Sequence, residues 1–500
     1  MLTTLAAPAF AGTWSIENGD ITVKAGETGN DVTQNNVTTK NDTDTIITNS
    51  DKDTASSHTV TIETNDKNDK VEVTLDNVNI KADSGSALTS KGDVTLTLKG
   101  DNSLTGGNGG SGISSSGSLT ISGGENNSLT AQGGSGSGIF SSGGVTISGG
   151  TVNATGGTGG TGENSNGGSG IYIYSSSGSL TVSGGTVTAN GGSGGGNGGD
   201  GISSTNTTIS GGSTVTANGG NGGSLVGGDG IRSGGGLTVS DGTVTAKGGN
   251  GDSKDGYGGD GIRSGGVVTI SGNTVNAAGG YGGKVGGYGI CSFDRVAISG
   301  GTVEAAGGNG STGGGSGIYS SVIDLSGSLE LTAKAGSPNG KALSQNGSEL
   351  VLDTIKDKLG PGAKVTATDA DGKVIDQVST PRPVEPEESS SSSDGGSSAP
   401  SAPASPLPGL TVTDKDGQRI SYTSTQSGNT LTVCVGRLTA SFRISLAALR
   451  QLRAEGIETI AFQTVLCSTT LSVDELLAMG GEDAEAVLTH RFTDSSLTVG

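Results

Sequence analysis

The residues best suited to chemistry occupy one recurring position, directly after a Gly-Ile pair that returns every 26 to 32 residues. In chain order this position holds Ser114, Phe140, Tyr172, Ser203, Arg232, Arg263, Cys291 and Tyr319. Aromatic faces stack on sugar rings, and arginine pairs with uronate carboxylates through two parallel hydrogen bonds. The residues predicted to bind carbohydrate are Phe140, Tyr172, Arg232, Arg263 and Tyr319. The alternative is that this column only packs against glycine-rich loops.

A second recurring position holds aspartate in three consecutive repeats, within the phrase Gly-Gly-Asp-Gly-Ile: Asp200, Asp229 and Asp260. Stacked about 5 Å apart, such like charges cost roughly 1 kcal/mol per pair in water and more when shielded from it. Bound calcium, which takes several carboxylate oxygens, is one source of compensation that we expect. Arg232 and Arg263 are the other source. Plain Asp-Gly turns with solvated side chains are the third interpretation.

Catalytic machinery is sparse. The chain has two histidines, His58 and His490, and neither lies in a nucleophile motif. A polysaccharide lyase needs calcium-binding carboxylates beside a basic proton acceptor, which only the arginines near the aspartates approximate. Glycine tracts such as 191–199 lack the lysine and the following helix of a phosphate site. We therefore expect the protein not to be an enzyme.

The repeat itself indicates which elements position these residues. Each Gly-Ile pair is followed by two further short β segments and a glycine-rich tract of variable length. Three β segments per 26 to 32 residues are typical of one coil of a parallel β-helix, for which right-handed winding is the rule. The fold class predicted is all-β, with a parallel β-helix, a disordered linker and a small α+β domain.

Stacked coils should place equivalent residues in columns about 4.8 Å apart. One predicted inward column is Ile121, Ile147, Val182, Ile209, Val239, Ile270, Ile298 and Leu325. Another is Leu129, Val152, Val187, Val215, Val244, Val275, Val303 and Leu331. At the corner between them a serine recurs in every coil: Ser122, Ser148, Ser183, Ser210, Ser240, Ser271, Ser299 and Ser326. Its hydroxyl is expected to bond to backbone or to the next coil's hydroxyl.

The amino-acid composition argues against some classes of function. The 500 residues include 98 glycines, and only 30% are hydrophobic, which suits a narrow stacked core. A net charge of −20 argues against nucleic acid as a partner, because phosphate binding needs a basic face. Without an apolar run of eighteen residues, no membrane insertion is expected.

The boundaries of the expected parts follow from local composition. Residues 1–11 end in Ala-Phe-Ala and suggest the remnant of a signal peptide, so we expect a secreted or cell-surface protein. The predicted parts then are the β-helix at 12–345 (irregular coils 12–110, regular coils 111–335), a short β extension at 346–379, a Pro/Ser/acidic linker at 380–409 and the small domain at 410–500.

The C-terminal domain has its own signals. Strands are expected at 431–435 and 457–463, a helix capped by Ser445, and a capping box of Ser472 with Glu475 before a second helix. Cys434 and Cys467 are candidates for a disulfide. No chemistry is evident here, and its position after a spacer suggests attachment to a cell-surface partner.

Residues 71–107 carry a family resemblance. They read VEVTLDNVNI, a segment of small residues, then DVTLTLKGDNSLTGG. This passage resembles the carbohydrate-binding β-helix family of clostridial secreted proteins, which are related in fold to pectate lyases, and the likeness covers roughly residues 14–340. The resemblance implies non-catalytic binding of plant-type polysaccharide, including acidic sugars, with bound calcium. The alternatives are an adhesive or structural stalk without a sugar site, and a polysaccharide lyase.

Overall fold

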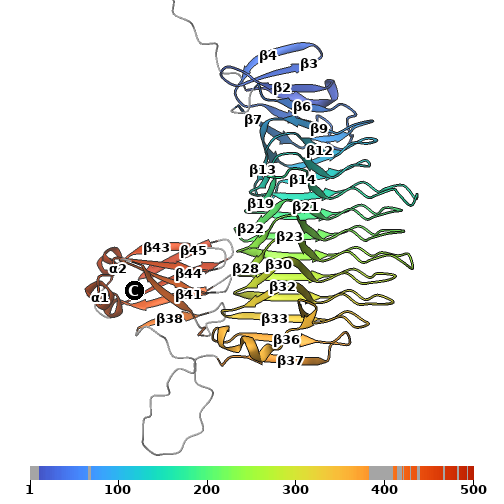
Figure 1. Ribbon diagram of the computed structural model, residues 1–500. Coiled ribbons are helices and arrows are strands. Elements are labelled where there is room, and N and C mark those ends of the chain that lie inside the picture. Colours follow the sequence, from blue (N-terminus) through green and yellow to red (C-terminus); the bar gives the residue numbers. More distant parts are fainter. Residues whose placement is uncertain are drawn as a thin grey trace, which may run out of the picture. The chain divides into compact units, whose positions relative to one another are not determined.

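The computed structural model describes residues 11–65, 69–381, 409–413, 419–420, 422–427, 429–435, 440–464, 468–480, 484–491 and 494–499. The chain forms two compact units, Met1–Glu387 and Glu388–Gly500. The first is the stack of coils coloured blue to orange in Figure 1. The predicted all-β parallel β-helix, followed by a small domain after the linker, is confirmed.

Each regular coil of the first unit contributes one strand to each of three faces. The first face holds the Gly-Ile strands: β9 (Leu88–Lys91), β12 (Ile113–Ser115), β15 (Ile139–Ser141), β18 (Ile171–Ile173), β21 (Ile202–Ser204), β24 (Ile231–Ser233), β27 (Ile262–Ser264), the starts of β30 (Ile290–Ile298) and β32 (Ile318–Leu325), and β34 (Leu343–Gln345). The second face holds β7 (Lys70–Asp76), β10 (Asp93–Lys99), β13 (Leu119–Gly123), β16 (Val145–Ile147), β19 (Ser179–Val182), β22 (Asn206–Ile209), β25 (Leu237–Val239), β28 (Val268–Ile270) and the ends of β30 and β32.

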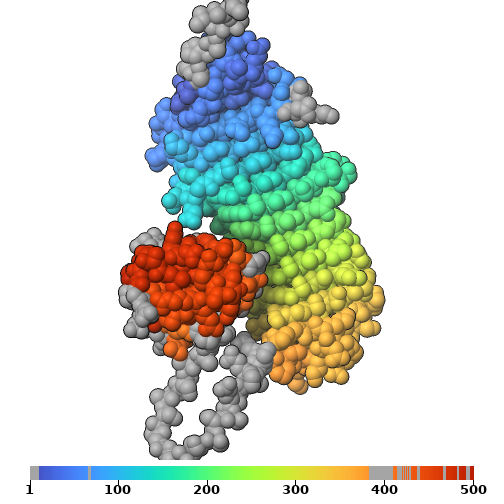
Figure 2. All heavy atoms as spheres, turned by 90° about the vertical axis from the view of Figure 1, so that its left-hand side faces the viewer, coloured from blue at the N-terminus to red at the C-terminus, as the bar shows by residue number. Residues whose placement is uncertain are grey.

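The third face is one continuous sheet that runs from β8 to the C-terminal end of the stack. Its parallel strands are β8 (Asn79–Lys81), β11 (Asp101–Thr105), β14 (Ser128–Gln132), β17 (Thr151–Thr155), β20 (Thr186–Asn190), β23 (Ser213–Asn218), β26 (Gly242–Lys247), β29 (Thr274–Ala278), β31 (Gly301–Ala306), β33 (Leu329–Lys334) and β36 (Lys364–Thr368). The glycine-rich tracts follow this face and form the row of loops at the right-hand edge of Figure 1. In Figure 2 the coils appear as parallel ridges of atoms.

The predicted inward columns are buried and in register. On the second face Ile147 is the register partner of Ile121 and of Val182, and the pairing continues through every coil to Leu325. On the third face the same continuity runs from Leu129 to Leu331. Each of these side chains is at most 1% exposed. Burial of one such side chain stabilises the fold by about 1.5–3 kcal/mol, so the columns are the core.

The corner serines differ from expectation in one respect. Their side chains are exposed or half-buried. The Ser148 hydroxyl donates to Ile121 O at 3.4 Å as expected, but the bond that recurs between coils comes from the backbone N–H, as in Ser183 N to Ile147 O at 2.9 Å. A second serine column, not singled out from the sequence, is buried at the end of the first-face strands. Its members include Ser115, Ser141, Ser233, Ser264, Ser292 and Ser320. Their hydroxyls bond mostly to corner carbonyls, as in Ser264 Oγ to Gly235 O at 3.0 Å.

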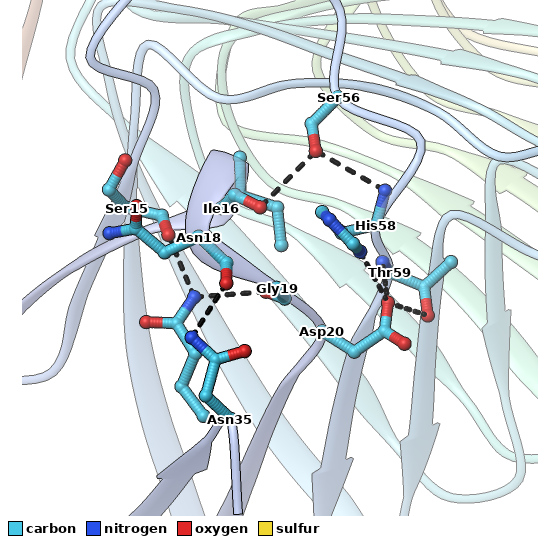
Figure 3. A network of polar contacts seen from close by, with 10 residues as sticks. Ser15, Ile16, Asn18, Gly19, Asp20, Asn35, Ser56, His58 and Thr59 are labelled. Carbon is cyan, nitrogen blue, oxygen red and sulfur yellow. Dashed lines mark hydrogen bonds and ion pairs between the residues drawn. The ribbon is translucent and has the colours of Figure 1, made fainter.

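The N-terminal end of the stack is capped by irregular structure, as expected of a solenoid. β1 (Thr13–Ser15), β5 (Ile46–Thr48) and β6 (Val60–Glu63) continue the parallel pairing, whereas β2 (Ile21–Ala25), β3 (Asn30–Gln34) and β4 (Val37–Asp42) form an antiparallel meander. Side chains tie the short helix η1 (Ile16–Asn18) to this cap (Figure 3). Asn35 Nδ2 donates to Asn18 O at 2.7 Å, and Ser56 Oγ donates to Ile16 O at 3.2 Å.

The C-terminal end of the stack is closed by residues 346–379. β34 turns back into β35 (Ser348–Glu349), and the 3-10 helix η2 (Leu352–Lys358) follows. β36 adds a last parallel strand to the third face, and β37 (Val374–Ser379) pairs with it in antiparallel orientation. The predicted β extension is therefore the last coil and its cap.

The second unit has two sheets and two helices among its described residues. One sheet contains β38 (Leu410–Thr413), β41 (Ala440–Ser445), β44 (Glu485–Arg491) and β45 (Asp494–Val499), and the other β39 (Thr423–Ser427), β40 (Thr430–Cys434), β42 (Thr459–Gln463) and β43 (Ser468–Ser472). The predicted caps are present: Ser445 Oγ accepts from Ala448 N before α1 (Leu446–Ala454), and Ser472 Oγ accepts from Glu475 N at the start of α2 (Val473–Met479). The predicted Cys434–Cys467 disulfide stays a prediction, because Cys467 lies outside the described residues.

Within the described residues, no helix is both long enough and apolar enough to cross a bilayer.

Candidate functional site

The glycine-rich tracts, expected to be loops, are ordered and form one wall of the site. Each tract has a first limb that leaves the third face and a second limb that returns to the first face. Hydrogen bonds run along the stack, as in Gly219 N to Lys247 O at 2.8 Å. They also alternate between the limbs, from Gly220 N to Gly199 O and from Gly228 N to Gly220 O, both at 2.8 Å. We call this arrangement the glycine lattice.

The lattice requires glycine at its inner positions because the limbs approach within backbone contact. A Cβ built on Gly228 would lie 1.9 Å from Gly199 O, and one on Gly220 would lie 2.1 Å from Gly192 O. The same clash recurs in the neighbouring coils, where Cβ atoms on Gly259 and Gly287 would meet carbonyl oxygens at 2.0 and 1.9 Å. Close backbone packing therefore accounts for the glycines at these positions.

Asparagine and aspartate side chains cap N–H groups at the edges of the lattice. On the first limb, Asn221 Oδ1 accepts from Asn250 N at 2.9 Å, and Asn250 Oδ1 accepts from Tyr281 N at 3.0 Å. On the second limb, aspartates do the same: Asp200 Oδ1 accepts from Asp229 N at 2.8 Å, and Asp229 Oδ1 from Asp260 N at 2.7 Å. Asp260 Oδ1 continues the series by accepting from Tyr288 N at 2.7 Å. The predicted vertical register of the three aspartates is thus present.

The aromatic and arginine column lies beside these aspartates on the first face. Register pairing joins the whole series in order: Ser114, Phe140, Tyr172, Ser203, Arg232, Arg263, Cys291 and Tyr319. The Phe140 and Tyr172 rings lie 5.8 Å apart. Tyr319, several coils away, stacks instead on Tyr288 at 4.9 Å. The column is not uniformly exposed: Cys291 is buried, and burial raises the pKa of its thiol to about 12.

A groove of about 970 Å³ runs between this column and the second limbs of the lattice. Tyr172 and Arg232 line it from the first face, and Asn197 and Asp200 line it from the lattice. Tyr174, which the column pattern does not include, also lines the groove, is 68% exposed and has its ring 6.0 Å from that of Tyr172. Of the five predicted sugar-binding residues, Tyr172, Arg232 and Arg263 therefore line one groove.

The aspartates are largely withdrawn from solvent, which shapes their electrostatics. Burial raises the pKa of Asp200, although Asp229 N–H and Arg232 oppose the shift. Burial, together with the charges of Asp260 and Asp200, raises the pKa of Asp229 well above its usual range. Burial raises the pKa of Asp260 to about 6, against the stabilising Tyr288 N–H and Arg263. Ionising all three aspartates is therefore costly.

The two arginines supply compensation at the ends of this column. Arg263 Nη1 donates to Asp260 Oδ2 at 3.3 Å, and Arg232 Nη1 lies 4.0 Å from Asp200 Oδ2. Among the described residues, no three carboxylate, imidazole or thiol side chains converge to hold a metal ion. Each aspartate already uses one oxygen to cap backbone N–H. Calcium binding at Asp200, Asp229 and Asp260 stays a prediction, whereas the arginine alternative is supported by one hydrogen-bonded pair and one pair at longer distance.

Comparison with known proteins gives no further assignment. The chain matches no protein-family model, no curated protein and no solved structure.

Proposed function

We propose that the protein binds a polysaccharide, without cleaving it, in the groove between the first face and the glycine lattice. The observation that carries this proposal is the meeting of Tyr172 and Tyr174 with Asp200 and Arg232 along one groove. Aromatic rings offer apolar faces to pyranose rings, while carboxylate and guanidinium groups bond to hydroxyls. Polymer binding suits this place because the same positions recur coil after coil along the stack.

The groove's contents favour binding over catalysis. Among the residues that line the groove there is no histidine. Each of the three aspartates uses its Oδ1 atom to cap a backbone N–H group, which is a structural rather than a catalytic use of that oxygen. Secretion or display at the cell surface, with the second unit serving attachment, completes the proposal and rests on the sequence alone.

The test removes the aromatic platform. In the Tyr172→Ala/Tyr174→Ala variant, retention on immobilised polysaccharides should fall about 10- to 100-fold for the glycan that the wild type binds, as truncation of central aromatic contacts does. Tyr281→Ala is the matched control, because Tyr281 is 48% exposed on a first limb and does not line the groove. Equal retention of both variants would contradict the proposed site, and release of unsaturated oligosaccharides would indicate a lyase.

A structural stalk is the second candidate, and the glycine lattice favours it. Backbone bonds in two directions and caps at both ends make a stiff rod that needs no ligand. Failure of the wild type to bind any member of a broad glycan array would favour this candidate.

A further inference from the structure

We infer that the groove recognises an uncharged polysaccharide, because the charge of each of its arginines is already balanced by an aspartate. This inference rests on the polysaccharide binding proposed above and deepens it by naming the class of sugar. It replaces the expectation that Arg232 and Arg263 pair with uronate carboxylates.

Each arginine faces an aspartate of the protein, while its own side chain stays partly exposed to the groove. Asp260, whose side chain is 5% exposed, accepts from Arg263 at 3.3 Å. Asp200, whose side chain is 15% exposed, lies 4.0 Å from Arg232. Asp260 is too buried to turn to water, and the capping bond from Asp229 N holds Asp200 in place, so both keep facing their arginines. A uronate that approached either guanidinium would meet the carboxylate that the guanidinium already faces.

The carboxylate charge is not needed for the lattice. Asparagine performs the same capping of the next coil's N–H at Asn197, Asn221 and Asn250, with N···O distances of 3.3, 2.9 and 3.0 Å. Aspartate replaces asparagine in the one column that lies beside the arginines. Because a buried charge is costly, its presence there indicates a use beyond capping. Neutralising and orienting the two guanidinium groups is the use that the contacts support.

The remaining charges also disfavour an acidic polymer. The whole chain carries a net charge of −20, which repels a polyanion at long range. Each aspartate–arginine ion pair along the groove holds guanidinium N–H donors beside carboxylate acceptors. That combination matches the hydroxyls of a neutral sugar, whose ring can stack on Tyr172 and Tyr174.

The test uses polymers that share a backbone and differ in charge. The probes are methyl-esterified and de-esterified homogalacturonan, and hydroxyethyl- and carboxymethyl-cellulose, in affinity electrophoresis with the full chain. The wild type should bind the neutral member of a pair at least 10-fold more tightly. Asp200→Asn/Asp260→Asn keeps the capping oxygens but leaves both arginines unbalanced, so the preference should fall to about one or reverse. The Asn250→Asp control places a new carboxylate on a first limb and should leave the preference unchanged.

The outcomes separate this inference from the proposal beneath it. Equal or tighter binding of the acidic polymers by the wild type would overturn the inference while polysaccharide binding stood. An unchanged preference in the double asparagine variant would also overturn it. Binding of neither member of either pair, together with no binding to any member of the broad glycan array, would overturn the proposed function, and the inference with it. Thermal denaturation of each variant confirms that the lattice remains folded.

Discussion

Replacing Gly228 by alanine probes the glycine lattice at a point where its two limbs are in close backbone contact. The new Cβ would lie 1.9 Å from Gly199 O and 2.5 Å from its carbonyl carbon, and both atoms belong to backbone. The second limb would have to move by roughly 1.5 Å or more to restore ordinary contact. Such a shift breaks the bonds from Gly228 N to Gly220 O and from Gly249 N to Gly228 O, both 2.8 Å long. Losing two buried hydrogen bonds costs about 2–6 kcal/mol.

Hydrogen–deuterium exchange with mass spectrometry measures the loss of local stability in the coils next to Gly228. Each 1.4 kcal/mol is a factor of ten, so peptides that cover residues 219–261 should exchange about 30-fold faster or more. Gly313→Ala is the matched control on the same lattice, because its Cβ would meet only Val285 methyl groups at 3.8 Å. That control should exchange like the wild type. Equal exchange in the two variants would refute the rigid lattice.

Two further predictions follow from buried polar groups. Burial raises the pKa of Asp260 to about 6, whereas the pKa of an aspartate in an unfolded chain is about 3.9. Because the folded-state pKa is the higher one, the stability contributed by protonated Asp260 is fully present below about pH 4. This stability is lost as the pH rises through 6. Thermal denaturation between pH 4 and 7 should show this loss in the wild type, and Asp260→Asn should flatten the profile; an unchanged profile would contradict the assignment. Ser90 Oγ is buried without a hydrogen-bond partner, so Ser90→Ala should leave the free energy of unfolding unchanged or raise it. Ser264 Oγ donates to Gly235 O, so Ser264→Ala should lower the free energy of unfolding by about 1 kcal/mol, as measured by urea denaturation. The reverse order would show that the serine column is wrongly described.

Periodicity in the sequence was sufficient to predict the columns. Because a strand alternates its side chains, a Gly-Ile pair at a constant interval indicates both the inward isoleucine and the outward residue beside it. The register of Ile121 with Ile147, and of Arg232 with Arg263, followed directly. The helix caps at Ser445 and Ser472 were equally predictable, since they depend on local side-chain chemistry.

The glycine tracts were not predictable by the same reasoning. Their lengths vary between coils, and contacts between limbs arise from residues far apart in the chain. The signal that could have identified the lattice is the recurring pair at Gly191-Gly192 and again at Gly198-Gly199, flanked by asparagine or aspartate. Tyr174 was missed because it lies just beyond the strand β18, where alternation no longer defines a face. The groove therefore cannot be predicted from the sequence pattern alone, because its two sides come from segments that are far apart in the chain.

The most direct test of the proposed function is a crystal structure of the full chain with a neutral oligosaccharide that binds it. The geometry predicts pyranose rings against Tyr172 and Tyr174, with sugar hydroxyls within hydrogen-bond distance of Asp200 and Arg232. Oligosaccharide bound on another surface, without contact to these four side chains, would contradict it.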